Sequence, residues 1–526
     1  MSDGSLSAKT AAALVLLASV CFADPAAALY ETSATPAPAN RIDRPVLQKL
    51  AEKGIQPAAT CSDSTFVRRV YLDTTGTIPT ADEARAFIGD RTPEKRAKLI
   101  DTLLADDAFA DYCAMQWCDR LRVKSEFPIN LWPNAVQAYY RWIHTSIREN
   151  KRYDQFVREI LIANGSNFRV PQVNFFRALQ DSEPGTIAQA AALAFMGVRT
   201  DRWPERKQAD LAAFFSDIRF KRTGEWKEEI VYADLFDQSP ADRRPETLAF
   251  PDGTETDVPH DVDARSAFAD WLIRPANPWF ARNAVNRISH QLLGRGIIHE
   301  PDDIRPDNPP SNSELLALLE REFVESGYDT RHIYRLILTS ATYQRSALPA
   351  ADTPEAGHLF AHYPLRRTDA ETLIDTLCKI TGTVEEYWSV IPEPFTFIPT
   401  EQSAITLADG SITSSFLEQF GRPPRDTGFA AERNNQITPT QKLHLLNSSH
   451  VLKKLESVPR NLPNRSRGNP IANVQELYLA ILSRYPTPGE MGIIRSYARN
   501  AEARGPQVAV DISWALINSP EFLYKH

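Results

Sequence analysis

Two arginines in a proline-rich segment offer the clearest chemistry in this sequence. The segment 420–428 reads FGRPPRDTG, and its prolines favour a polyproline II helix with three residues per turn. Arg422 and Arg425 are therefore expected to project from the same side, roughly 9 Å apart. Such a pair of guanidinium groups suits bidentate binding of a carboxylate, phosphate or sulfate group. The alternative is an internal clamp, in which both arginines pair with carboxylates of the protein itself.

Other polar residues could complete a ligand site with this pair. One group follows the pair directly, and another lies in the segment 277–305, where Arg282 and Asn286 would share one helical face. Arginine and aspartate networks of this kind can hold loops in place or line a polar cleft. The predicted ligand-binding residues are Arg287, Arg295, Arg422, Arg425, Asp426, Glu432, Arg433 and Asn435.

An enzymatic activity on polysaccharides is the main rival hypothesis. Glycoside cleavage uses two carboxyl groups across a cleft, roughly 5–10 Å apart. The sequence contains no GxGxxG, GxxxxGK[ST], HExxH, GxSxG or CxxC motif, so no catalytic residue is assigned. The carboxylates considered for such a role are Asp303, Asp409, Asp426 and Glu432.

The histidines do not predict a metal site. His358 and His362 have the four-residue spacing that could place two imidazoles on one helical face. Gly357 and Pro364 flank them and argue against a helix there.

The composition excludes several classes of protein. The chain has 526 residues with 43% hydrophobic and 24% charged residues, which argues against a wholly disordered or polytopic membrane protein. Its net charge of -8 provides no general attraction to nucleic acid, which is therefore not an expected partner.

The first residues have the pattern of a secretory signal peptide. Residues 11–23 read AAALVLLASVCFA, and small residues follow, so cleavage is expected between Ala23 and Ala28. No later segment reaches about 18 consecutive apolar residues, so the mature chain is expected to have no transmembrane segment. The sequence therefore predicts a secreted or periplasmic protein.

Four cysteines remain after such cleavage. Export would permit disulfides, but Cys113 and Cys118 are five residues apart on an expected helix and point to different sides. A bridge from Cys61 to one of them is conceivable, and buried free thiols, including Cys378, are the favoured interpretation.

Helical signals dominate the rest of the chain and predict a mainly α fold with two helical domains, small β additions and long proline-rich loops. Capping-box patterns begin at Thr80, Ser311, Thr368 and Thr487, and Pro93 and Pro488 stand at expected first helical positions. The other expected helices cover 107–122, 134–149, 153–163, 185–197, 265–273, 278–293, 438–455, 471–483 and 506–517, and the expected strands are 229–236 and 395–407.

The domain organisation follows from changes in composition. The acidic, proline-rich stretch 237–260 has few apolar residues and is the expected linker. The predicted order is a signal peptide (1–28), an exposed leader (29–45), a helical domain (46–236), the linker (237–260) and a second helical domain (261–526).

Several long motifs resemble a known family. They lie at 68–88, 96–117 and 153–161 in the first domain, and at 277–297, 305–319, 341–346, 420–428 and 443–449 in the second. Together they resemble the secreted planctomycete-type family that joins domain of unknown function fifteen-forty-nine, also called the planctomycete cytochrome-type domain, to domain fifteen-fifty-three. The resemblance implies this two-domain arrangement and no particular activity.

The chain departs from that family at one place. Many relatives carry a C-x-x-C-H haem-attachment signature between a GVR-like and a DRW-like segment. Here Gly197-Val198-Arg199 is followed by Thr200 and then directly by Asp201-Arg202-Trp203. Covalent haem requires two thiols and an axial histidine at that spacing, so no c-type haem and no other cofactor is predicted.

Together, these features favour a secreted protein that binds an extracellular ligand or partner through its arginine-rich region. An anionic polysaccharide would match the guanidinium pair. The alternatives are an extracellular hydrolase or lyase acting on polysaccharides, and a cell-envelope scaffold derived from a haem-bearing ancestor.

The missing signature gives a direct prediction. The purified full-length protein should show no Soret absorption band and no haem stain after denaturing electrophoresis, because no cysteine is available at the attachment position. A Soret band that persists through denaturation would overturn this prediction.

Overall fold

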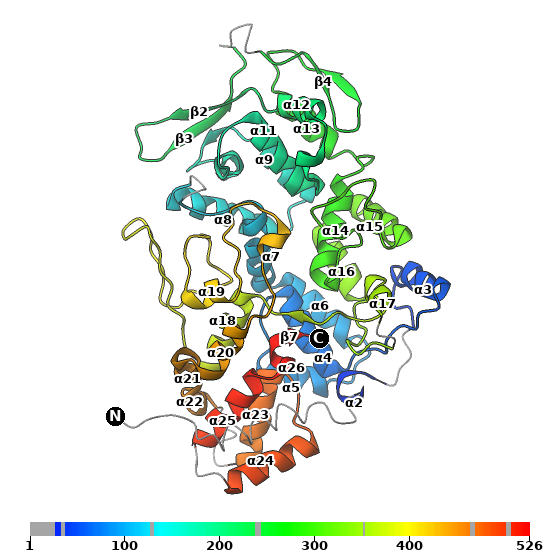
Figure 1. Ribbon diagram of the computed structural model, residues 1–526, viewed down its shortest axis with the longest axis vertical. Coiled ribbons are helices and arrows are strands. Elements are labelled where there is room, and N and C mark those ends of the chain that lie inside the picture. The colour runs from blue at the N-terminus through cyan, green and yellow to red at the C-terminus, as the bar shows by residue number, and fades with distance from the viewer. Residues whose placement is uncertain are drawn as a thin grey trace.

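The computed structural model describes residues 27–32, 37–126, 131–236, 243–350, 353–462, 469–500 and 506–526. It is elongated, with two β-hairpins at one end and a group of helices at the other (Figure 1). The fold is mainly α with small β additions, which confirms the predicted fold class. Residues 1–26, which carry most of the predicted signal peptide, lie outside the described residues.

The first half of the chain forms a series of short helices. They are α2 (Ala27–Tyr30), α3 (Asp43–Glu52), α4 (Asp63–Thr74), α5 (Ala81–Gly89), α6 (Lys95–Ala105), α7 (Asp107–Arg120), α8 (Pro133–Arg148), α9 (Tyr153–Leu161), α10 (Asn174–Arg177), α11 (Pro184–Ala191) and α12 (Glu205–Ala213). Single turns of other helical types follow or precede them: η1 (Pro171–Val173), η2 (Ala192–Met196) and η3 (Thr200–Arg202).

The second half is also helical. Its helices are α13 (Ala264–Leu272), α14 (Phe280–Leu293), α15 (Ser313–Glu325), α16 (Thr330–Leu338), α17 (Pro354–His358), α18 (Ala370–Thr381), α19 (Ser415–Gln419), α20 (Pro439–Asn447), α21 (Ser449–Leu455), α22 (Val458–Asn461), α23 (Pro470–Leu482), α24 (Pro488–Asn500), α25 (Pro506–Ile517) and α26 (Pro520–Leu523), with one 3-10 turn, η4 (Ala430–Glu432).

The strands form three small antiparallel sheets. Strand β3 (Glu229–Ala233) pairs with β1 (Gly165–Ser166) and β2 (Ile218–Arg222), and β4 (Thr247–Ala249) pairs with β5 (Glu255–Asp257). Strand β6 (Arg366–Arg367) pairs with β7 (Tyr524–Lys525). The strand expected within 229–236 is present, whereas 395–407 forms turns and irregular backbone, so the second strand prediction is wrong.

Local capping chemistry explains where several helices begin. Thr80 and Thr487 each exchange hydrogen bonds with the glutamate three residues later, as a capping box requires. At the other two patterns the structure differs, because Asn312 rather than Ser311 caps α15 and α18 has no side-chain cap. The helix expected over 438–455 is divided in two, since the hydroxyl of Ser448 caps α21 and ends α20.

The apolar side chains form two main hydrophobic cores. The first core contains buried residues between Ile42 and Tyr363, together with Ala408, and the second contains residues between Ala370 and Phe522. The described part of the expected linker, 243–260, is largely exposed, but Leu248, Phe250 and Val258 anchor it to the first core, and Phe250 stacks on Trp271 at 5.1 Å. The first core thus continues through both predicted helical domains.

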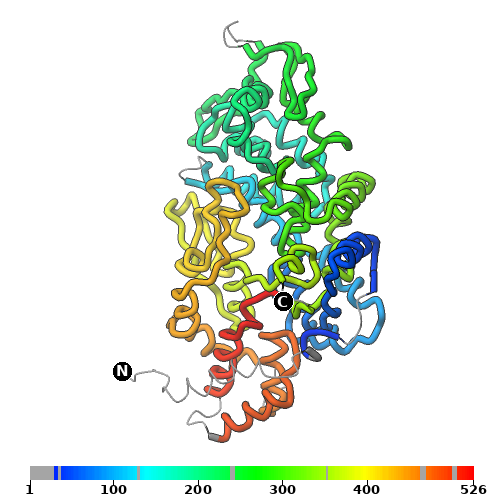
Figure 2. Tube along the Cα trace, turned by 45° about the vertical axis from the view of Figure 1, so that its right-hand side comes forward, coloured from blue at the N-terminus to red at the C-terminus, as the bar shows by residue number. Residues whose placement is uncertain are grey.

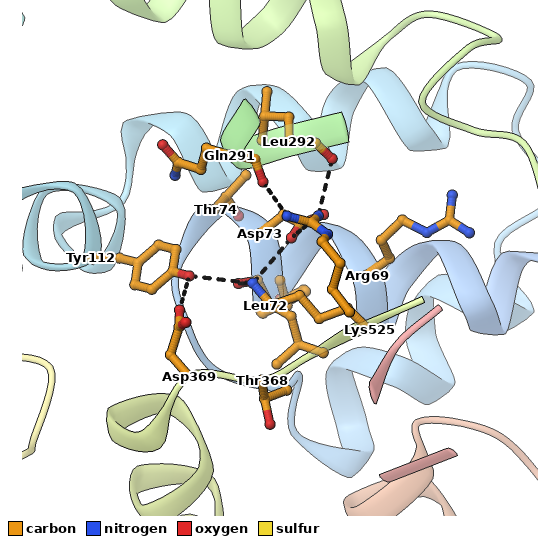
Figure 3. A network of polar contacts seen from close by, with 12 residues as sticks. Arg69, Leu72, Asp73, Thr74, Tyr112, Gln291, Leu292, Thr368, Asp369 and Lys525 are labelled. Carbon is orange, nitrogen blue, oxygen red and sulfur yellow. Dashed lines mark hydrogen bonds and ion pairs between the residues drawn. The ribbon is translucent and has the colours of Figure 1, made fainter. Parts of the chain in front are cut away.

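A buried carboxylate connects the two cores. Asp73 on α4 has no exposed surface and accepts hydrogen bonds from the hydroxyls of Tyr343 and Tyr363, at 3.0 and 2.8 Å. Its other oxygen lies 3.2 Å from Arg366 on β6 and 3.2 Å from Lys525 on β7. Figure 3 shows that Lys525 lies between Asp73 and Tyr112. The last strand is therefore tied to one of the first helices.

The described cysteines form no disulfide. Cys61, Cys113 and Cys118 are buried free thiols, and Cys378 is a half-buried free thiol, so the bridge from Cys61 is not formed.

Removing the charge of Asp73 should destabilise the protein strongly. We expect Asp73→Asn to lower the free energy of unfolding by about 3–5 kcal/mol, because Arg366 and Lys525 would remain buried without their shared carboxylate. Urea denaturation followed by circular dichroism measures the change.

The matched control is Asp101→Asn, which removes an exposed carboxylate paired with Arg335. Its effect should stay within about 1 kcal/mol. Equal losses for the two variants would contradict the role assigned to Asp73.

Candidate functional site: a cationic pocket between the two halves of the chain

A cavity of about 380 Å³ lies where the two halves of the chain meet, next to α7 and α14. The tube view in Figure 2 shows the C-terminal segment running toward the middle of the molecule, and Lys525 from this segment lines the cavity. The lining residues are Tyr112, Gln116, Asp119, Arg120, Arg287, His290, Gln291, Gly294, Pro301, Arg366, Arg367, Asp369, Pro423, Gly428, Phe429, Ala430, Arg433, Asn435 and Lys525.

Helix α7 supplies one wall. Tyr112, Gln116 and Arg120 are spaced four residues apart, so the 3.6-residue period places them along one face of the helix. Asp106 caps the start of this helix, because its side chain accepts a hydrogen bond from the backbone N–H of Ala108.

Helix α14 supplies a second wall through Arg287, His290 and Gln291. His290 and Gln291 follow Arg287 by three and four residues, so they lie on the same side of the helix. Arg287 forms an ion pair with Asp302 at 2.6 Å and is held further by Asn283 at 2.8 Å. The side-chain oxygen of Gln291 accepts a hydrogen bond from Tyr334. These contacts fix the helix face that borders the cavity.

The loop 423–435 closes the cavity with an ion-pair cluster. Arg433 lies 2.7 Å from Asp119 and 2.7 Å from Glu371, and Asn435 donates to Asp369 at 2.8 Å. Burial opposes the charge of Arg433, yet the carboxylates of Glu371 and Asp119 raise its pKa well above the ordinary value. Burial likewise raises the pKa of Asp369, but Arg433 and Lys525 outweigh it and lower that pKa to about 2. Arg433 and Asp369 are therefore both charged at neutral pH.

Positive charge exceeds negative charge around the cavity. The lining residues and their direct ion-pair partners comprise seven cationic side chains and five carboxylates. Only Arg120 and Arg367 among these cations have no carboxylate partner within the described residues. Arg367 is satisfied in other ways, since it donates to Gln441 and lies 5.0 Å from the ring of Phe420.

Arg120 is the exceptional cation. It is half-buried, lines the cavity, and forms no hydrogen bond or ion pair with any residue that the structure describes. Its guanidinium group makes a cation–π contact with the ring of Trp117, 4.9 Å from the ring centre. Burial and then the charge of Arg287 lower the pKa of Arg120, and the opposing effect of Tyr334, Tyr153 and Asp302 is smaller.

The structure places three of the eight predicted ligand residues in the cavity wall: Arg287, Arg433 and Asn435. The arginine pair Arg422 and Arg425 is not the solvent-facing fork that we expected. Arg425 is 1% exposed, and its φ of 61° breaks the polyproline II geometry. The side chain of Arg425 pairs with Asp119 at 2.9 Å, and Arg422 lies 3.6 Å from Glu371. The internal clamp is the correct interpretation of this pair.

The other predicted residues hold loops. Asp426 pairs with Lys124 at 2.8 Å, and Glu432 accepts a hydrogen bond from the backbone of Asp426 at 2.7 Å. The Nε atom of Arg295 is buried without a hydrogen-bond partner among the described atoms, and Arg295 does not line the cavity.

The carboxylates considered for catalysis do not line the cavity either. Asp303 pairs with Arg202 and Arg305, and Asp409 accepts a hydrogen bond from the backbone of Ser125 at 2.9 Å. Among the described residues, no group of three or more histidine, cysteine, aspartate or glutamate side chains could hold a metal ion.

Sequence reasoning missed Gln116 and Arg120, although their spacing on an expected helix was visible. The sequence does not reveal that Arg120 lacks an ion-pair partner, because the neighbouring carboxylate of Asp119 pairs with Arg425 and Arg433, more than 300 residues away.

Two family models match this chain, one in each half. Residues 41–222 match the model PSCyt2, protein of unknown function (DUF1549), and residues 264–498 match the model PSD1, protein of unknown function (DUF1553). The chain belongs to the family of proteins that combine these two domains in this order. No curated protein and no solved structure matches. No helix in the described part of the chain has the length and apolar character needed to cross a membrane.

His290 should make the stability of the protein sensitive to acid. Burial, and next the charges of Arg366, His299 and Arg287, lower its pKa from 6.5 to about 3. Between these values the unfolded chain binds the proton and the folded chain does not, so stability falls as the pH falls below about 6.5.

We expect His290→Gln to remove this contribution. The thermal midpoint of the variant, relative to that of the wild type, should be higher at pH 4.5 than at pH 7.5, as measured by scanning calorimetry. A constant difference between these pH values would show that His290 does not titrate in this way.

Proposed function

We propose that this protein is an exported binding protein whose central cavity holds an anionic group of an extracellular ligand. The ligand class that we favour is an anionic polysaccharide or a fragment of one. The proposal keeps the chemistry predicted from the arginine-rich region and assigns it to the cavity of α7, α14 and the loop 423–435.

The observation that carries the proposal is the unpaired guanidinium of Arg120. A cation in a partly desolvated wall costs free energy unless an anion compensates it, and nearly every other cation in this wall has a carboxylate. A bound carboxylate or sulfate would supply the missing charge and could form two parallel hydrogen bonds with Arg120. The cavity volume of about 380 Å³ falls in the usual range for small-ligand sites.

The pocket is unlike the glycosidase arrangement. Its two lining carboxylates, Asp119 and Asp369, are held by arginine, tyrosine and asparagine side chains. A general acid on a glycan requires a carboxyl group with a raised pKa, whereas the pKa of Asp369 is lowered to about 2. Binding therefore has more support than hydrolysis at this site.

Isothermal titration against sulfated and uronic-acid oligosaccharides tests the proposal. Arg120→Gln should weaken binding of an anionic oligosaccharide at least tenfold, because a hydrogen bond to a charged group contributes about 1.5–3 kcal/mol. Since Arg120 has no partner in the described residues, the variant should fold normally.

The matched control is Arg141→Gln, which removes an equal charge from an exposed position on α8 outside the cavity. Its affinity should equal that of the wild type. Absence of binding by the wild type, or equal affinities for the Arg120 and Arg141 variants, would refute the proposal.

A further inference from the structure

The cavity also presents acceptors that a simple anion cannot satisfy. The carboxylates of Asp119 and Asp369 line it beside the cations. Asp119 accepts hydrogen bonds from Arg425 and Arg433, and Asp369 accepts them from Tyr112 and Asn435. A carboxylate has about four acceptor positions, so each retains capacity for a ligand donor. A sulfate or carboxylate group cannot donate to these oxygens, whereas a ligand hydroxyl can.

Gln116 adds a neutral polar group one helical turn from the unpaired cation, Arg120. It is half-buried, lines the cavity, and forms no hydrogen bond with any described residue. It stands one helical turn before Arg120, so the two side chains border the cavity as neighbours. Its amide can donate to one ligand oxygen and accept from a hydroxyl. The ligand therefore needs a neutral polar group close to its anionic group.

An aromatic ring provides the remaining kind of surface. Phe429 lines the cavity from the loop that follows Gly428, and the guanidinium of Arg199 lies 5.0 Å from the centre of its ring. Pro301 and Pro423 line the cavity as well. An apolar wall with a few placed polar groups is the usual composition of a small-ligand site, and it matches a ring that has both C–H faces and hydroxyl edges.

We propose that the cavity binds a sugar acid, a hydroxylated ring that carries a carboxylate, such as a uronic acid. The inference rests on the anion binding proposed above and specifies the ligand class for the same site. Arg120 binds the carboxylate, and Gln116, Asp119 and Asp369 bind the ring hydroxyls. The same chemistry is presented by a free sugar acid and by a residue of a polyuronide chain.

Two probes of similar size separate the hydroxyls from the charge. D-galacturonate and cyclohexanecarboxylate both carry one carboxylate on a six-membered ring, and only the sugar carries hydroxyls. In isothermal titration with the full chain, galacturonate should bind at least tenfold more tightly. Gln116→Leu should weaken galacturonate binding roughly fivefold or more, because a buried hydrogen bond is lost, and should leave the affinity for cyclohexanecarboxylate unchanged.

The matched control is Gln137→Leu, at an exposed position on α8 outside the cavity, which should not change either affinity. Trigalacturonate distinguishes the sources of the ligand, since tighter binding than the monomer indicates a polyuronide and equal or weaker binding indicates the free sugar acid. Equal affinities for galacturonate and cyclohexanecarboxylate would overturn the sugar-acid inference alone. If no sulfated or uronic-acid probe binds, the proposed function fails with it.

Discussion

The carboxylate of Asp73 is buried together with two cations from the other half of the chain, Arg366 and Lys525. Burying a charge is costly unless its partners are in place, so this contact defines one relative position of α4 and the β6–β7 pair. Lys525 in turn contacts the hydroxyl of Tyr112, which donates to Asp369. Through these contacts Asp73 is connected to four residues that line the cationic pocket: Arg366, Lys525, Tyr112 and Asp369.

The same principle explains why the pocket is cationic rather than neutral. Several of its arginines have two roles: the guanidinium group pairs with an internal carboxylate, and the residue still borders the cavity. Arg287 and Arg433 are both of this kind. Such pairs hold the wall in place, and the side chain of Arg120 keeps its hydrogen-bonding capacity, because it has no hydrogen-bond or ion-pair partner among the described residues. A preorganised wall lowers the entropic cost of binding.

Features with local causes could be predicted from the sequence, and features with distant causes could not. The starts of α5 and α24 depend on Thr80 and Thr487 and the glutamates three residues later, which the sequence displays directly. The burial of the Arg425 side chain depends on its ion pair with Asp119, 306 positions earlier, and no local sequence pattern predicts that contact. Of the predicted residues, Arg287, Arg433 and Asn435 therefore line the cavity, whereas Arg422 and Arg425 are held by internal carboxylates.

The position of Lys525 has a consequence for the order in which the protein folds as the polypeptide is synthesised. The family matches end at residue 498, yet the strand β7 lies beyond them and completes both the Asp73 contact and the wall of the cavity. During synthesis the first hydrophobic core can form before residue 525 is added, but the wall of the cavity is incomplete until then.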